Sequence, residues 1–95
     1  MDLFLDSLRA ALRLVEPRIA SSDSPLAAEI RRRIDKAVEH IERAVALWRQ
    51  HAEERATGVS HSWKTTRRRA RRYVRQSRRQ WKGAMRLLGQ LPQAA

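Results

Sequence analysis

Eleven lysines and arginines lie between Thr57 and Ala95, and this part of the chain contains no aspartate or glutamate. Nine of the eleven are arginine, the exceptions being Lys64 and Lys82. Residues 1–56 contain ten basic and ten acidic side chains, so the whole formal charge of +11 comes from the last 39 residues. Guanidinium groups form paired hydrogen bonds with phosphate oxygens and also stack on bases. Such a segment is typical of proteins that bind a polyanion, most often nucleic acid.

Helical spacing gathers most of these side chains on one side of an expected helix over residues 63–88. At 100° per residue, nine of them fall within a sector of about 120°, which we call the basic face. Its members are Lys64, Arg68, Arg71, Arg72, Arg75, Arg78, Arg79, Lys82 and Arg86. The face is ~33 Å long, and members four residues apart are separated by ~6 Å along the axis. That separation is close to the phosphate spacing of an extended single strand, and the length is about one turn of a duplex.

The basic face differs from an ordinary solvated helix surface, which mixes positive and negative charges. Its like charges are neighbours at i,i+3 and i,i+4, and each such pair destabilises a helix by a few tenths of a kcal/mol. Such repulsive pairs are present along the whole length of the expected helix. We therefore interpret the face as a binding surface.

The segment from Thr65 to Lys82 resembles the arginine-rich motif helices of viral RNA-binding proteins. The resemblance is carried by Thr66 and by three clusters, at residues 67–69, 71–72 and 78–81. It covers less than a fifth of the chain and implies RNA binding. The segment departs from that pattern because it also carries a regular apolar seam. This seam favours a packed helix that lies along a backbone over a free helix deep in a groove.

The N-terminal segment predicts a short first helix over about residues 2–15. Asp2 can act as its N-cap. Pro17 marks the expected end, because proline disfavours helical geometry at the residue before it. The apolar residues that share one face at helical spacing are Phe4, Leu5, Leu8, Ala11, Leu12 and Val15. Leu3, Ala10 and Leu14 lie off this face, either as scattered surface residues or as a small contact patch for another subunit.

A second helix is expected over residues 25–57. Ser24 suits its N-cap and Pro25 its first position, while Gly58 is the expected C-terminal stop. Its heptad seam consists of Ala27, Ile30, Ile34, Ala37, Ile41, Ala44 and Trp48. The opposite face is balanced by the i,i+4 pairs Arg31–Asp35, Glu39–Arg43 and Arg49–Glu53.

The third helix, over residues 63–88, follows a short connector in which Ser60 or Ser62 is the expected cap. Its seam consists of Trp63, Ala70, Val74, Ser77, Trp81, Ala84, Leu88 and Leu91. We expect tryptophans of one long helix to fill gaps left by small residues of the other. The aromatic side chains could stack on bases, but their seam positions favour core packing. Gly83 marks the expected close approach of another backbone.

These patterns predict a single all-α domain. A short connector between two long helices implies an antiparallel hairpin, and the first helix should cover part of its groove to complete a three-helix bundle. The core of a 95-residue chain with this pattern is thin. The thin core is compatible with dimerisation or with docking on other protein subunits of a larger assembly.

The sequence offers no convincing catalytic or cofactor-binding motif, so we expect neither enzymatic activity nor a cofactor. There are no cysteines, and His40, His51 and His61 lack metal-ligand spacing, so no metal site is expected. The N-terminus is a poor signal peptide, and no run approaches the ~18 apolar residues of a membrane span. A soluble, cytoplasmic protein is the expectation.

Three functions are compatible with the charge pattern. The first is a non-enzymatic accessory protein, or small subunit of a nucleoprotein complex, that clamps the backbone of RNA or DNA through the basic face with little sequence readout. The second is an inhibitor or adaptor that docks on an acidic protein surface. The third is binding to a membrane surface. It is disfavoured because the apolar face of the helix over residues 63–88 is rich in alanine, serine and threonine, which offer little area to insert into lipid. We expect nucleic acid as the partner, and no membrane.

Overall fold

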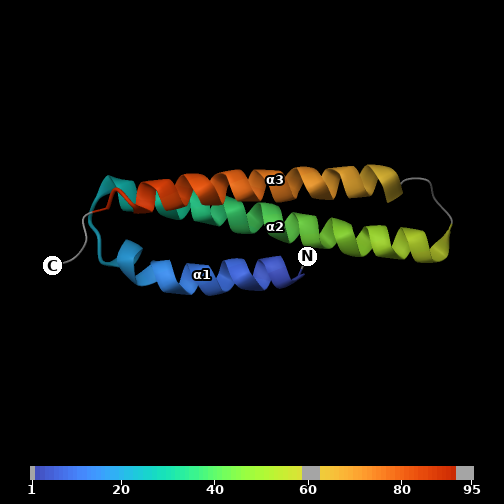
Figure 1. Ribbon diagram of the computed structural model, residues 1–95, viewed down its shortest axis with the longest axis horizontal. Helices are drawn as coiled ribbons and strands as arrows, with labels where there is room; N and C mark the ends of the chain where they lie inside the picture. Colours follow the sequence, from blue (N-terminus) through green and yellow to red (C-terminus); the bar gives the residue numbers. More distant parts are fainter. Residues whose placement is uncertain (1, 59–62, 92–95) are drawn as a thin grey trace.

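The computed structural model describes residues 2–58 and 63–91, with side chains described from residue 5 onward. Three helices make up the chain: α1 (Asp2–Ala20), α2 (Pro25–Thr57) and α3 (Trp63–Leu88). The two long helices α2 and α3 form an antiparallel hairpin, and α1 runs back along the first half of α2 (Figure 1). The molecule is a rod with extents of 59 × 18 × 14 Å. The predicted all-α three-helix bundle is confirmed, with no strand among the described residues.

The boundaries of α2 follow the local signals in the sequence. Ser24 is extended, with φ −67° and ψ 139°, and its hydroxyl accepts a hydrogen bond from the Leu26 N–H at 3.1 Å. Pro25 occupies the first helical position, where its missing N–H leaves no donor unsatisfied. Gly58 ends the helix in the left-handed region at φ 63°, and its N–H donates to the Glu54 carbonyl at 3.2 Å. These expected caps are therefore confirmed.

The end of α1 differs from its prediction. The helix does not stop near Val15 but continues through Pro17 to Ala20. Beyond the proline, Ile19 is only 4% exposed and joins the hydrophobic core. Burial of such a side chain contributes ~1.5–3 kcal/mol, and a proline close to the helix end removes a single intrahelical donor. Tertiary packing therefore outweighs the local tendency of proline to end a helix.

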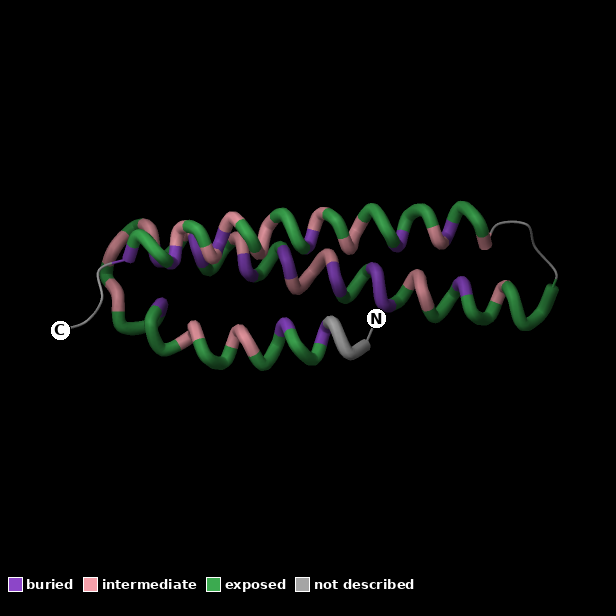
Figure 2. Tube along the Cα trace, viewed as in Figure 1, coloured by how far each residue is buried: buried purple, intermediate pink, exposed green. Residues whose placement is uncertain are grey.

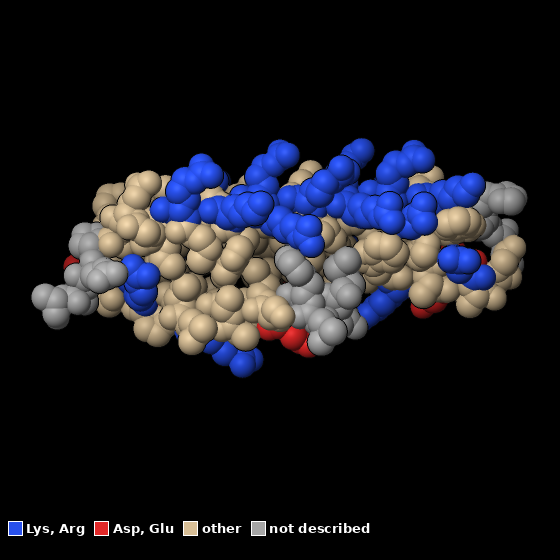
Figure 3. Space-filling model, viewed as in Figure 1, with Lys and Arg blue, Asp and Glu red and all other residues tan. Residues whose placement is uncertain are grey.

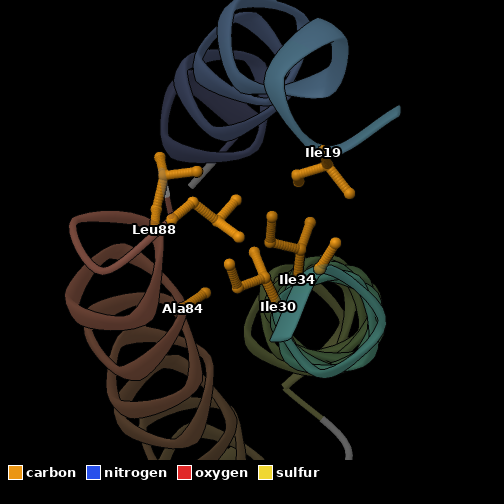
Figure 4. Close-up of a cluster of buried hydrophobic side chains, with 7 residues drawn as sticks. Ile19, Ile30, Ile34, Ala84 and Leu88 are labelled. Atoms are coloured by element: carbon orange, nitrogen blue, oxygen red, sulfur yellow. The ribbon is translucent and has the colours of Figure 1, made fainter. Parts of the chain in front are cut away.

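A cluster of buried side chains joins all three helices at one end of the rod. Ile19 of α1, Ile30 and Ile34 of α2, and Ala84 and Leu88 of α3 converge on one another (Figure 4). A second cluster, nearer the middle of the rod, joins α1 to α2 through Leu5, Leu8, Ile41, Ala44 and Val45. Helix α1 therefore covers α2 only as far as about Val45, as expected for a short helix over part of the hairpin.

Small residues bring α2 and α3 into close contact. Ala37 and Ala44 of α2, and Ala70, Ser77 and Ala84 of α3, are all fully buried. The Ser77 hydroxyl donates to the Ala37 carbonyl at 2.7 Å, which satisfies the one polar side-chain group at this contact. This contact fixes which side of α3 faces inward, and hence which side faces solvent.

The tryptophans were expected to fill gaps left by small residues of the facing helix, and they are found in two environments. Trp81 is half-buried and packs against both hydrophobic clusters. Near the far end of the hairpin, the His51 ring meets Trp48 edge-on at 5.2 Å and Trp63 at 5.7 Å between ring centroids. Here Thr66, which the seam prediction missed, is buried and donates to a Glu54 carboxylate oxygen at 3.0 Å.

Burial decreases along the hairpin where α1 no longer covers it. Buried positions are frequent in the first half of α2 and sparse in its last third (Figure 2). The described residues 46–57 and 63–72 therefore form a two-helix segment with a narrow interface. The candidate caps Ser60 and Ser62 and the side chain of Asp2 lie outside the described part of the structure.

Candidate nucleic-acid interface

The basic face predicted from the sequence lies on the solvent side of α3. All nine of its side chains are exposed: Lys64, Arg68, Arg71, Arg72, Arg75, Arg78, Arg79, Lys82 and Arg86. The buried side of the same helix consists of Thr66, Ala70, Ser77, Ala84 and Leu88. In the space-filling view, lysine and arginine side chains gather along the edge formed by α3 (Figure 3). Packing against α2 thus turns the charged sector outward along its full length.

Four glutamates, Glu16, Glu29, Glu39 and Glu42, form ion pairs away from α3. Ion pairs described by the structure lie on α1 and α2, and they are Arg9–Glu42, Arg31–Glu16, Arg32–Glu29, Arg33–Glu29, Lys36–Glu39 and Arg43–Glu39. Eight of the nine members of the basic face, all except Arg78, have no carboxylate partner among the described residues. The positive charge of these eight side chains is therefore not neutralised within that part of the molecule.

Ion pairing on α1 and α2 shifts the pKa values of Glu29 and Arg31. The hydrogen bond from Arg32, aided by Arg33, holds the pKa of Glu29 below its ordinary value. The hydrogen bond to Glu16 raises the pKa of Arg31. Arg31 was expected to pair with Asp35 on its own helix, but it bonds to Glu16 of α1 instead, because α1 lies alongside. The expected Glu39–Arg43 pair is present at 3.1 Å.

A shallow depression of about 310 Å³ lies on the basic face itself. Its lining residues are Arg75, Arg78, Arg79 and Lys82. Because every lining side chain is cationic, the depression has the electrostatic character of a seat for a phosphate group.

Arg67 and Arg69 of α3 lie outside the basic face and extend the positive surface around the helix, Arg67 beside the Trp63 ring. Arg67 places its Cζ 5.7 Å from the centre of the Trp63 ring, and Lys64 places its Nζ at 5.6 Å. Arg55 of α2 adds a third cation at 5.1 Å. Three cations therefore lie close to the Trp63 ring. Sequence reasoning missed Arg55, because its contact depends on how the two helices lie side by side.

The other flank of the hairpin carries a second cation–aromatic contact. Arg69, exposed and outside the basic face, lines a depression together with Tyr73 of α3 and Arg43 of α2. The Cζ of Arg43 lies 5.8 Å from the centre of the Tyr73 ring. The expected core packing of Tyr73 and Trp81 is present, since both lie against the buried clusters, but these two residues and Trp63 are only half-buried. Each therefore retains some accessible surface.

The arrangement suits electrostatic binding of an extended polyanion. Within the described ranges, no group of histidine, aspartate and glutamate side chains could hold a metal ion. No helix in the same ranges combines the length and apolar character needed to cross a membrane.

The fold and the charge distribution define a small helical bundle with one strongly cationic face. Comparison with family models, curated proteins and solved structures gave no match.

Proposed function

We propose that this protein is a non-enzymatic nucleic-acid-binding protein that clamps a phosphate backbone through the basic face of α3. The observation that carries the proposal is the row of exposed cations along α3, eight of which lack a carboxylate partner in the described structure. A row ~33 Å long matches the dimensions of a nucleic-acid backbone over several phosphates. The charge-balanced helices α1 and α2 provide the scaffold.

The chemistry of the side chains favours phosphate over other anions. Nine of the eleven basic residues after Thr57 are arginine, whose planar guanidinium binds two phosphate oxygens at once. Contacts of this kind position a protein on the backbone but do not read the base sequence. We therefore expect little sequence preference, and a cytoplasmic accessory role beside other components of a nucleoprotein complex.

The salt dependence of binding tests the proposal. We would measure the Kd for a labelled oligonucleotide by fluorescence anisotropy between ~50 and ~200 mM salt. The logarithm of the binding constant should fall with log salt by about 0.7 per phosphate contacted for a single strand and about 0.9 for a duplex. With about five phosphates contacted, affinity should fall by roughly two orders of magnitude over this range.

A charge-matched pair of variants locates the surface. The triple variant Arg71→Gln, Arg75→Gln and Arg79→Gln removes one i,i+4 row of the basic face. The control variant removes three exposed arginines of α1 and α2, as Arg9→Gln, Arg13→Gln and Arg32→Gln. Each lowers the formal charge of +11 by three. The first should reduce both the affinity and the salt slope, and the second should change them little.

Two results would contradict the proposal. Equal losses in the two triple variants would show that net charge, and not the basic face, determines binding. Displacement of the oligonucleotide by poly-glutamate at equal charge concentration would show that the face does not prefer phosphate. That second result would instead favour an acidic protein surface as the partner.

A further inference from the structure

A depression on the flank of the hairpin combines apolar surface with two guanidinium groups. It lies between α2 and α3 and has a volume of about 310 Å³. Its lining residues are Arg43, Ala46 and Leu47 of α2, and Arg69 and Tyr73 of α3. A surface with apolar and aromatic walls between two cations suits a flat, polarisable group that accepts hydrogen bonds at its edge.

Tyr73 is held in place within this depression. Its ring stacks on His40 with centroids 5.9 Å apart and an interplanar angle of 28°. Arg43 lies over the same ring at 5.8 Å and is itself held by Glu39 at 3.1 Å. Two of the side chains that would contact a ligand, Tyr73 and Arg43, are therefore positioned before it arrives, which lowers the entropic cost of binding.

Helical spacing places one wall of the depression beside the basic face. Arg69 lines the depression, and Arg72 of the basic face lies three residues further along α3. Residues three apart on a helix are surface neighbours, with Cβ atoms about 5–6 Å apart. A phosphate bound at Arg72 would thus hold its attached nucleoside within reach of Arg69 and the Tyr73 ring.

We propose that this depression binds a nucleobase, and that the nucleic-acid partner is therefore single-stranded. The inference rests on the function proposed above. The base contacts Leu47 and the Tyr73 ring, while the guanidinium groups of Arg43 and Arg69 stack on it or donate to its edge. In a duplex the bases are paired and face inward, so only an unpaired base can turn into a site beside the backbone-binding surface.

Tyr73 provides a direct probe because it is the only tyrosine in the chain. The protein labelled with 3-fluorotyrosine should give a single ¹⁹F resonance. We would titrate it with a single strand of about 12 nucleotides, within the usual site sizes, with an abasic strand of the same length and with the corresponding duplex. The resonance should shift with the intact strand and stay nearly unchanged with the other two. The abasic strand should also bind at least about fivefold more weakly.

A double variant, Arg43→Gln with Arg69→Gln, tests the two guanidinium groups, both of which belong to exposed residues. It should bring the Kd ratio of abasic to intact strand towards one. The double variant Arg9→Gln with Arg13→Gln removes the same charge from α1 and should preserve the ratio.

If intact and abasic strands bind equally but with strong salt dependence, the base site is wrong and the backbone function stands. Tighter binding of the duplex than of the single strand would also overturn the base site. Loss of salt dependence would overturn the backbone function itself.

Discussion

Replacing Arg75 by glutamate should make the protein more stable while weakening its binding of a polyanion. Arg75 has an arginine at each of its four helical neighbour positions, i±3 and i±4, namely Arg71, Arg72, Arg78 and Arg79. Each like-charge pair destabilises a helix by ~0.2–0.5 kcal/mol, and an opposite pair stabilises it by a similar amount. The substitution removes four repulsions, and the new carboxylate can satisfy one or two attractive pairs at a time. After allowance for screening, the expected gain is about 1–2 kcal/mol at low salt.

Thermal unfolding followed by circular dichroism measures this gain. For a domain of this size, 1 kcal/mol corresponds to roughly 4–8 °C in Tm, so Arg75→Glu should raise the Tm by roughly 4–16 °C at low salt. The difference should shrink at ~1 M salt, where the Debye length is only about 3 Å. Oligonucleotide affinity should fall in the same variant, because a phosphate contact becomes a repulsion.

The control is Arg13→Glu on α1. Arg13 is exposed like Arg75, but its helical neighbours are mixed in sign, with Arg9 at i−4 and Glu16 at i+3. Its substitution should therefore change the free energy of unfolding by no more than about 0.5 kcal/mol, and the Tm should stay close to that of the parent. If Arg75→Glu lowers the Tm at low salt, or raises it no more than Arg13→Glu does, the charges of the basic face do not repel one another as argued.

Three further changes test the packing and the ion pairs. Gly83→Ala should raise the free energy of unfolding by about 0.5–1 kcal/mol, because glycine is unfavourable inside a helix. The added Cβ meets only the flexible end of Arg33, with Nη1 at 2.8 Å, and this side chain can move aside. A lower Tm would show that Arg33 cannot move. Ser77→Leu should cost ~1–3 kcal/mol in urea unfolding, because Ser77 is fully buried against α2, and an unchanged midpoint would contradict the close approach of the helices. Glu29 has a lowered pKa in the folded protein, so its stabilising contribution is present above the ordinary value of 4.5 and is lost as the pH falls through the folded pKa. The Tm should therefore drop more between about pH 5 and pH 3 in the parent than in Glu29→Gln. Equal drops would count against the ion pairs of Glu29.

Local signals predicted the fold well where the decisive interactions are themselves local. Ser24, Pro25 and Gly58 act through hydrogen bonds and backbone angles within four residues, so the sequence alone places both ends of α2. The extension of α1 could not be predicted in this way. It depends on Ile19 meeting α2 and α3, and on Glu16 meeting Arg31, and both contacts join residues of different helices.

The same division applies to the candidate interface. Helical periodicity correctly places the basic face on the exposed side of α3, although its role in binding stays a prediction. The approach at Gly83 was expected to be another backbone, whereas the neighbour is the side chain of Arg33. The depression that joins Arg43 to Tyr73 needs residues 30 positions apart to share one groove. Sequence spacing contains no information on that register, so only the structure shows it.

The partial coverage of the hairpin by α1 has a consequence for dynamics. The backbone amides of residues 46–57 and 63–72 belong to two helices without a third, so they should exchange with deuterium faster than those of residues 27–45. Four members of the basic face, Lys64, Arg68, Arg71 and Arg72, lie on this segment. A bound polyanion would neutralise their mutual repulsion and slow the opening of the segment. Part of the binding free energy then stabilises the packed form of this two-helix segment against local opening. Ligand affinity and local stability are therefore thermodynamically linked.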